Sequence, residues 1–128
     1  MVGQKNSFSS FSVNNVQEAQ TFYEKTLGIK TSIQQPEGVL TLDMNGSGNV
    51  MLYPKPNHTP ATFTVLNFQV DNVEKAVDEL HDKGVEFEHY TGDIETNDKG
   101  IRDNGTHKIA WFKDPAGNIL SVIQNMEK

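Results

Sequence analysis

Two periodic patterns of hydrophobic and polar residues follow each other along the chain, one typical of strands and one typical of helices. The stretches "FSSFSV" (8–13) and "VLNFQV" (65–70) alternate with a period of two, which predicts strands with one buried face. Each is followed by apolar residues spaced three and four apart, which predicts an amphipathic helix. The expected buried stripe of the first helix is Val16, Ala19, Phe22, Tyr23 and Leu27, and that of the second is Val73, Ala76, Val77 and Leu80.

The two strand–helix pairs read as an internal repeat. Placing Val13 on Val70 also matches Asn15 with Asn72. Asn15 is the expected N-cap of the first helix, with Glu18 completing a capping box, and the second helix is expected to start at Asp71 or Asn72. Gly28 and Gly84 stand where helices end in a left-handed residue.

The ends of the two copies match as well. "GNVMLY" (48–53) aligns with "GNILSV" (117–122), and the turn "DPAGN" joins two expected antiparallel strands. Each copy is therefore predicted as βαβββ. We expect an α+β fold in a single domain, 1–128, with modules at about 6–55 and 63–126.

Two connecting segments stand out. The polar stretch 88–107 is expected as a long loop before the strand "KIAWFK", either as a wall or lid of a site or as a mobile surface loop. The proline-rich stretch 53–63 is expected to span between the modules in an extended form.

Composition indicates a globular chain. It has 128 residues, of which 35% are hydrophobic and 22% charged. No apolar run approaches the length of about 18 residues that a membrane helix needs, so no membrane is expected as a partner. The polar N-terminus lacks the apolar segment of a signal peptide, and cysteine is absent. We therefore expect a cytoplasmic protein without disulfides.

The formal net charge of −6 disfavours a nucleic-acid partner, because an acidic surface repels phosphate backbones. The same charge would slightly favour cationic ligands. A purely solubilising role for the charge is the simpler interpretation.

Two βαβββ modules with helix starts of the pattern V-x-N/D-V-x-x-A, the stretch "FYEKTLGI" and the terminal "DPAGNILSVI" resemble the vicinal oxygen chelate superfamily. This superfamily includes glyoxalase I, extradiol dioxygenases and the bleomycin- and fosfomycin-resistance proteins. The resemblance covers nearly the whole chain. It implies sheets curled into half-barrels with helices outside and a site on the concave face, while the function differs among members.

The resemblance also implies four metal-ligand positions, on the first and last strand of each module. Counted through the repeat, these positions hold Phe8, Leu52, Val65 and Ser121. Metal-using relatives carry His, Gln or Glu there, and the terminal motif usually ends in Glu. Three of the four side chains here have no lone pair to offer a divalent metal. We therefore predict that the chain holds no metal in the family's way and needs no cofactor.

Period-two alternation extends the expected site. If Phe8 and Val65 face the concave side, Ser10, Ser12, Asn67 and Gln69 do so too. Such a mixed lining suits a small-molecule pocket, or else polar groups that bond to one another inside a filled barrel. The expected ligand-binding residues are Phe8, Ser10, Leu52, His58, Val65, Asn67, Trp111 and Ser121.

Candidates for catalysis are few. His107, Tyr90 and Arg102 lie in or beside the long polar segment, where an imidazole, a phenol or a guanidinium could reach a ligand. His81 and His89 are expected to have structural or solvent-facing roles. Neither a serine-hydrolase elbow nor a phosphate-binding glycine loop is present.

Two functions remain open. The first is a metal-free binding protein of the resistance type, in which a groove takes a small organic molecule; the resemblance implies a homodimer. The alternative is a glyoxalase-like lyase or an extradiol-type dioxygenase, whose chemistry needs a divalent metal as Lewis acid. Metal-free turnover by His107, Tyr90 or Arg102 is a third, weaker possibility.

Overall fold

Each half of the chain folds as a strand, a helix and three further strands. The computed structural model describes residues 2–4, 6–44 and 48–126. The first half contains η1 (Val2–Gln4), β1 (Ser9–Val13), α1 (Val16–Thr21), η2 (Phe22–Thr26), β2 (Lys30–Gln34), β3 (Val39–Met44) and β4 (Gly48–Pro54). The second contains β5 (Thr64–Gln69), α2 (Val73–Asp82), η3 (Gly92–Ile94), β6 (Ile101–Asp103), β7 (His107–Lys113) and β8 (Ile119–Asn125). The prediction of an α+β fold with two βαβββ modules is confirmed.

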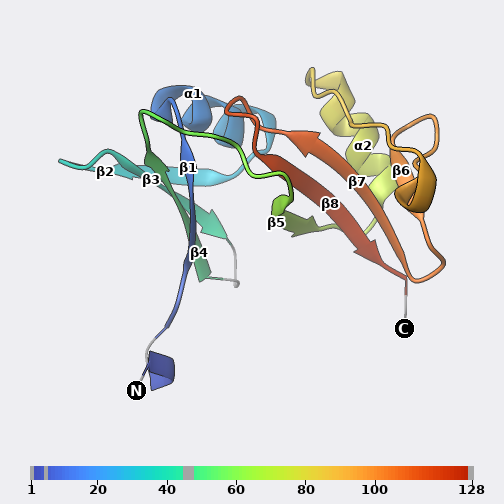
Figure 1. Cartoon of the computed structure of the whole chain (residues 1–128), viewed down its shortest axis with the longest axis horizontal. Coiled ribbons are helices and arrows are strands. Elements are labelled where there is room, and N and C mark those ends of the chain that lie inside the picture. Colours follow the sequence, from blue (N-terminus) through green and yellow to red (C-terminus); the bar gives the residue numbers. More distant parts are fainter. Residues whose placement is uncertain (1, 5, 45–47, 127–128) are drawn as a thin grey trace. The chain divides into compact units, whose positions relative to one another are not determined.

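The strands form two four-stranded mixed sheets of the same topology. Their orders are β1-β4-β3-β2 and β5-β8-β7-β6, and in each the first strand runs parallel to the last one along the chain. The remaining neighbours are antiparallel. The chain divides into two compact units, Met1–Pro60 and Ala61–Lys128, each with one sheet and one helix on it (Figure 1).

Both helices begin at the expected asparagine caps. Asn15 Oδ1 accepts a hydrogen bond from the Glu18 N–H at 2.9 Å, and Asn72 Oδ1 accepts one from the Lys75 N–H at 2.9 Å. The cap of the second helix is therefore Asn72 rather than Asp71. Gly28 and Gly84, which follow the helices, have positive φ values of 72° and 93°, a conformation that glycine adopts without strain.

One face of each sheet packs under its helix. In the second unit, α2 packs on β7 and β8 and buries Val73 and Val77. The Gln124 side chain confirms which face this is, because its Oε1 accepts a hydrogen bond from the Val73 N–H at 3.0 Å. The side chains of β7 and β8 buried on this face are Ala110, Phe112, Leu120 and Val122.

The turn between β7 and β8 is built by one carboxylate. Asp114 Oδ1 accepts hydrogen bonds from the backbone N–H groups of Ala116 and Asn118, and Asp114 Oδ2 accepts one from Asn118 Nδ2. Both side chains are almost fully buried. The "DPAGN" motif therefore has a structural role that fixes the start of β8.

Two expectations about connecting segments are wrong. The stretch 88–107 contains strand β6, which pairs Arg102 with Ile109, so it is not wholly loop. The proline-rich stretch includes a turn, in which the His58 N–H bonds to the Lys55 carbonyl at 3.0 Å. Among the helices of the described residues, none has the length and apolarity to cross a bilayer.

The first sheet corrects the repeat alignment by one residue. β1 pairs Ser10 with Met51 and Phe11 with Leu52, whereas β5 pairs Asn67 with Ser121. Ser10 and Asn67 are equivalent, so the residue equivalent to Ser121 is Met51. Leu52 lies instead on the helix-covered face and is fully buried. The expectation that Leu52 faces the concave side with Phe8 and Ser121 is wrong, because adjacent strand residues point to opposite faces.

This correction predicts different stabilities for two neighbouring variants. Leu52→Ala leaves a cavity in the core and should lower the free energy of unfolding by about 2–5 kcal/mol. Met51→Ala removes a half-buried side chain from the other face and should cost less than half as much. Urea denaturation would measure both values, with one m-value fitted to both variants and the wild-type protein. A larger loss for Met51→Ala would contradict the observed register.

Candidate functional site

The face of the second sheet turned away from α2 carries five of the expected site residues, namely Asn67, Arg102, His107, Trp111 and Ser121. Strand pairing places them on this face together, because paired residues in neighbouring strands point to the same side. We call it the open face of the second sheet, and it consists of Asn67, Gln69, Arg102, His107, Ile109, Trp111, Lys113, Ile119, Ser121, Ile123 and Asn125.

Ser121 is the buried polar group of this face. Its side chain has no solvent exposure, and its hydroxyl donates a hydrogen bond to Asn67 Oδ1 on the neighbouring strand. The bond satisfies a hydroxyl that would otherwise be costly to bury. It also orients the exposed Asn67 amide, whose N–H groups have no acceptor among the described residues. The Asn67 side-chain amide is thus a hydrogen-bond donor whose orientation is fixed by Ser121.

Trp111 lies next to Ser121, because the two residues pair across β7 and β8. Its ring meets the Tyr90 ring edge-on, with centroids 5.3 Å apart and planes at 66°. Thr96 holds Tyr90 in place through hydrogen bonds to its backbone N–H and carbonyl. Burial, with a smaller effect of the Glu88 charge, raises the pKa of Tyr90, so its phenol is neutral at physiological pH. The two rings form an aromatic wall beside a polar anchor.

Arg102 and His107 are both on the open face of the second sheet. Arg102 pairs with Ile109, and His107 pairs with Asn125. Gly100 keeps the backbone leading into β6 close to the preceding segment. It has a φ of 82°, and a Cβ there would lie 3.0 Å from both the Glu88 carbonyl oxygen and the Phe87 Cβ. The three catalytic candidates His107, Tyr90 and Arg102 are therefore on or beside one surface.

In the first sheet, the face away from α1 carries hydroxyl groups. Ser10, Ser12, Met51 and Tyr53 share this face through the β1–β4 pairing. Ser12 Oγ and His58 Nδ1 are hydrogen-bonded at 2.6 Å, so the His58 ring lies beside Ser12 on this face. Thr41, which pairs with Met51, is 7% exposed, and its hydroxyl has no hydrogen-bond partner among the described residues.

The metal-ligand positions do not fit a divalent metal. Phe8 is 62% exposed and precedes β1, and Val65 lies at the register shift between Thr64 and Leu66. With the corrected register, the last-strand positions hold Met51 and Ser121. A phenyl ring, an isopropyl group, a thioether and a hydroxyl provide neither carboxylate nor imidazole. The described residues also contain no group of three His, Cys, Asp or Glu side chains that could hold a metal.

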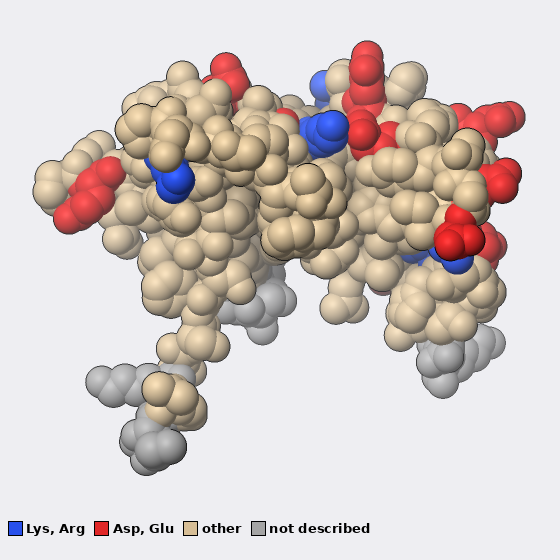
Figure 2. All heavy atoms as spheres, in the orientation of Figure 1, with Lys and Arg blue, Asp and Glu red and all other residues tan. Residues whose placement is uncertain are grey.

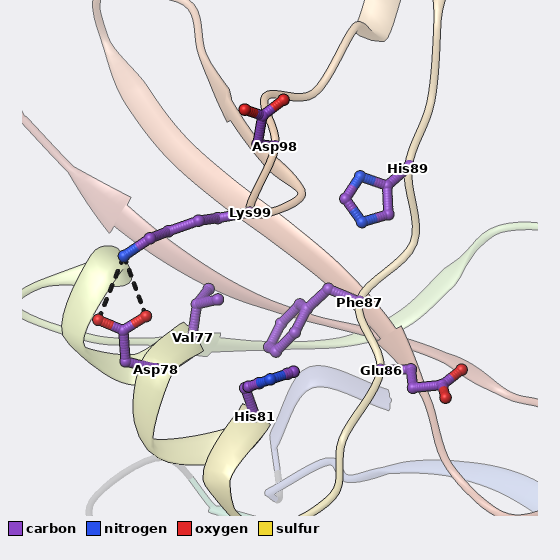
Figure 3. Close-up of a pocket in the computed structure, with 8 residues that line it drawn as sticks. All are labelled: Val77, Asp78, His81, Glu86, Phe87, His89, Asp98 and Lys99. Carbon is purple, nitrogen blue, oxygen red and sulfur yellow. Dashed lines mark hydrogen bonds and ion pairs between the residues drawn. The ribbon is translucent and has the colours of Figure 1, made fainter.

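A separate cavity of about 490 Å³ lies on the α2 side of the second unit (Figure 3). Val77 and Phe87 give it apolar surface, and the polar lining comes from α2 and the segment that follows. The polar lining residues are Asp78, His81, Glu86, His89, Asp98 and Lys99. Lys99 and Asp78 form an ion pair at 3.0 Å. The ion pair leaves Glu86 and Asp98 as the other charged groups of the lining, so the lining is predominantly acidic.

Sequence reasoning missed some of these residues. His81 and His89 were treated separately, but both line this cavity. Met51 was missed through the one-residue alignment error. The alternation of Val50 and Leu52, matching Leu120 and Val122, would have revealed it, since all four side chains are buried.

Two sheets of βαβββ topology, each with polar and aromatic groups on its open face, define an α+β protein of the glyoxalase type. The family model of the Glyoxalase/Bleomycin resistance protein/Dioxygenase superfamily matches residues 8–122. The chain belongs to this superfamily.

Relatives are distant in sequence but similar in fold. The uncharacterized protein YraH of Bacillus subtilis (strain 168) is 26% identical over 126 residues, which cover 88% of this chain and 91% of YraH. TnmS3, an antibiotic binding protein from Streptomyces sp. CB03234, has a TM-score of 0.71 at 23% identity, covering 95% of this chain and 98% of TnmS3. The fosfomycin resistance protein FosX from Listeria monocytogenes has a TM-score of 0.70 at 12% identity, covering 93% of this chain and 89% of FosX.

The misfit at the four positions leads to a direct prediction. Purified protein that has been dialysed against buffer with added zinc, nickel or manganese, and then against metal-free buffer, should retain far less than one metal per chain. Elemental analysis by mass spectrometry would measure the ratio. A stoichiometric metal that survives this treatment would refute the assignment of the four positions.

Proposed function

We propose that this chain binds a small organic molecule on the open face of the second sheet and does so without a divalent metal. The observation that supports it is Trp111 beside the Ser121–Asn67 hydrogen bond. An aromatic surface next to a fixed polar group is the usual composition of a small-molecule site. The name of TnmS3, an antibiotic binding protein with a similar fold, agrees with this proposal.

The alternative functions have weaker support. A glyoxalase-like lyase or a dioxygenase would need a Lewis-acidic metal, and the residues at the four family positions do not suit one. Turnover without a metal would draw on His107, Tyr90 and Arg102. Arg102 and His107 share the open face, while Tyr90 contacts it through Trp111. A cytoplasmic location remains a prediction from composition.

Trp111 is the only tryptophan, so its fluorescence reports on this face directly. A panel of non-fluorescent aromatic compounds should include members that quench or shift the emission in a saturable manner. Asn67→Ala should weaken binding of such a compound about tenfold, because a hydrogen-bond donor to the ligand is lost. Asn14→Ala, which removes an exposed amide from the first unit, should leave the affinity unchanged. If no compound changes the emission, or if both variants behave alike, the proposed site is wrong.

We also propose a homodimer. In the part of the chain that the structure describes, the two sheets end at β1 and β2 and at β5 and β6, and edge strands readily pair with another chain. Phe8 and Phe63 add large exposed apolar side chains near the starts of β1 and β5. Size-exclusion chromatography with light scattering should give twice the chain mass of 14.3 kDa. A monomer at micromolar concentration would contradict this proposal.

A further inference from the structure

The charged groups on the open face of the second sheet differ in sign from the chain as a whole. The strand residues of this face include two cations, Arg102 and Lys113, and no carboxylate. The carboxylate that reaches Lys113 comes from Glu88, whose Oε1 lies 3.6 Å from Lys113 Nζ. Lys113 is therefore paired with a carboxylate, whereas Arg102 is a cation of this face for which the described residues show no ion pair.

Arg102 has no anionic partner among the described residues. No described carboxylate lies within 4.0 Å of its guanidinium. Its sequence neighbour Asp103 pairs with Lys108 and points to the helix-covered face, since adjacent strand residues alternate. The side chain is only partly exposed, so the charge is displayed on a surface that is partly shielded from water.

The net charge of −6 does not cancel this local field. Acidic side chains are spread in separate groups over the surface seen in Figure 2. At physiological ionic strength, exposed charges farther apart than about 8 Å are largely screened from one another. The nearest charges to a ligand on this face are therefore the ones that decide its sign, and they favour an anion. This reverses the expectation, taken from net charge, that a cationic ligand is preferred.

The sheet register also sets the spacing between the strand positions that carry Arg102 and Trp111. Arg102 pairs with Ile109, and Trp111 lies two residues farther along β7. Diagonal neighbours of this kind are about 7–8 Å apart. A flat aromatic ring on Trp111 with an acidic group on its edge spans this distance, and the planar guanidinium can bind a carboxylate through two parallel hydrogen bonds.

We propose that the ligand class of this site is the aromatic carboxylates, with the ring on Trp111 and the carboxylate on Arg102. This inference rests on the proposed function and adds the chemical class of the ligand. Asn67, oriented by Ser121, provides a second donor on the same face. Arg102 thereby selects for a negatively charged group on the ligand. The Trp111 ring provides a stacking surface that does not depend on the charge of the ligand.

The test compares three compounds with the same ring system by isothermal titration calorimetry at neutral pH: naphthoate, naphthamide and naphthylmethylammonium. Naphthoate should bind at least about tenfold more tightly than the neutral amide, as a charge-assisted hydrogen bond implies. The ammonium compound should bind most weakly. Added salt should weaken binding of naphthoate and leave that of the amide nearly unchanged.

Variants of Arg102 test whether the preference for a carboxylate comes from the guanidinium itself or from any positive charge on the protein. Arg102→Gln should reduce the affinity for naphthoate to that for naphthamide, and Arg102→Lys should restore part of the difference, since it keeps the charge and loses the two-bond geometry. Lys75→Gln removes the same charge from an exposed position on α2 and should change neither affinity. A uniform loss of affinity for all three compounds in Arg102→Gln, with the preference intact, would overturn the proposal.

The outcomes distinguish this inference from the proposed function. Equal binding of naphthoate and naphthamide, or a preference for the ammonium compound, would overturn the ligand class while leaving a small-molecule site in place. Failure of all three compounds to bind, with no effect on Trp111 emission, would remove both the site and the ligand class.

Discussion

A β-strand presents successive side chains to opposite faces, and this alternation controls the organisation of both sheets. In the second sheet, Leu120 and Val122 pack under α2, while Ser121 between them points to the other side and bonds to Asn67. A shift of one residue would exchange core and site. The Asp114 turn, which fixes where β8 begins, therefore determines which side chains lie on the open face of the second sheet.

Much of the fold could be read from the sequence because its local signals agree with the final structure. The asparagine caps, the glycines after the helices and the alternation in β1 and β5 each depend on only a few neighbouring residues. The position of Leu52 could not be read in this way. Likeness between "GNVMLY" and "GNILSV" suggested one alignment, but the equivalence is set by hydrogen bonding to β1 and β5, which are distant in sequence.

In the candidate site, too, some positions can be predicted from neighbouring residues, while others depend on pairing with strands that are distant in sequence. The common face of Trp111, Ser121 and Asn67 could be predicted because all three sit on regular strands. The contribution of Arg102 was less visible, because β6 has three residues within a polar segment and only Ile101 among them is apolar. Its placement depends on pairing with β7. The field around a ligand likewise could not be obtained from the net charge, since it depends on which face each charge occupies.

The absence of a side chain at Gly100 has a consequence for how this surface can diversify. A Cβ at this position would lie 3.0 Å from atoms of both Glu88 and Phe87, so a side chain there would force the two segments apart by a few tenths of an ångström. The glycine therefore helps to fix the position of the strand that carries Arg102. Variation at this one position would therefore act on the placement of Arg102 without altering any residue of the open face of the second sheet.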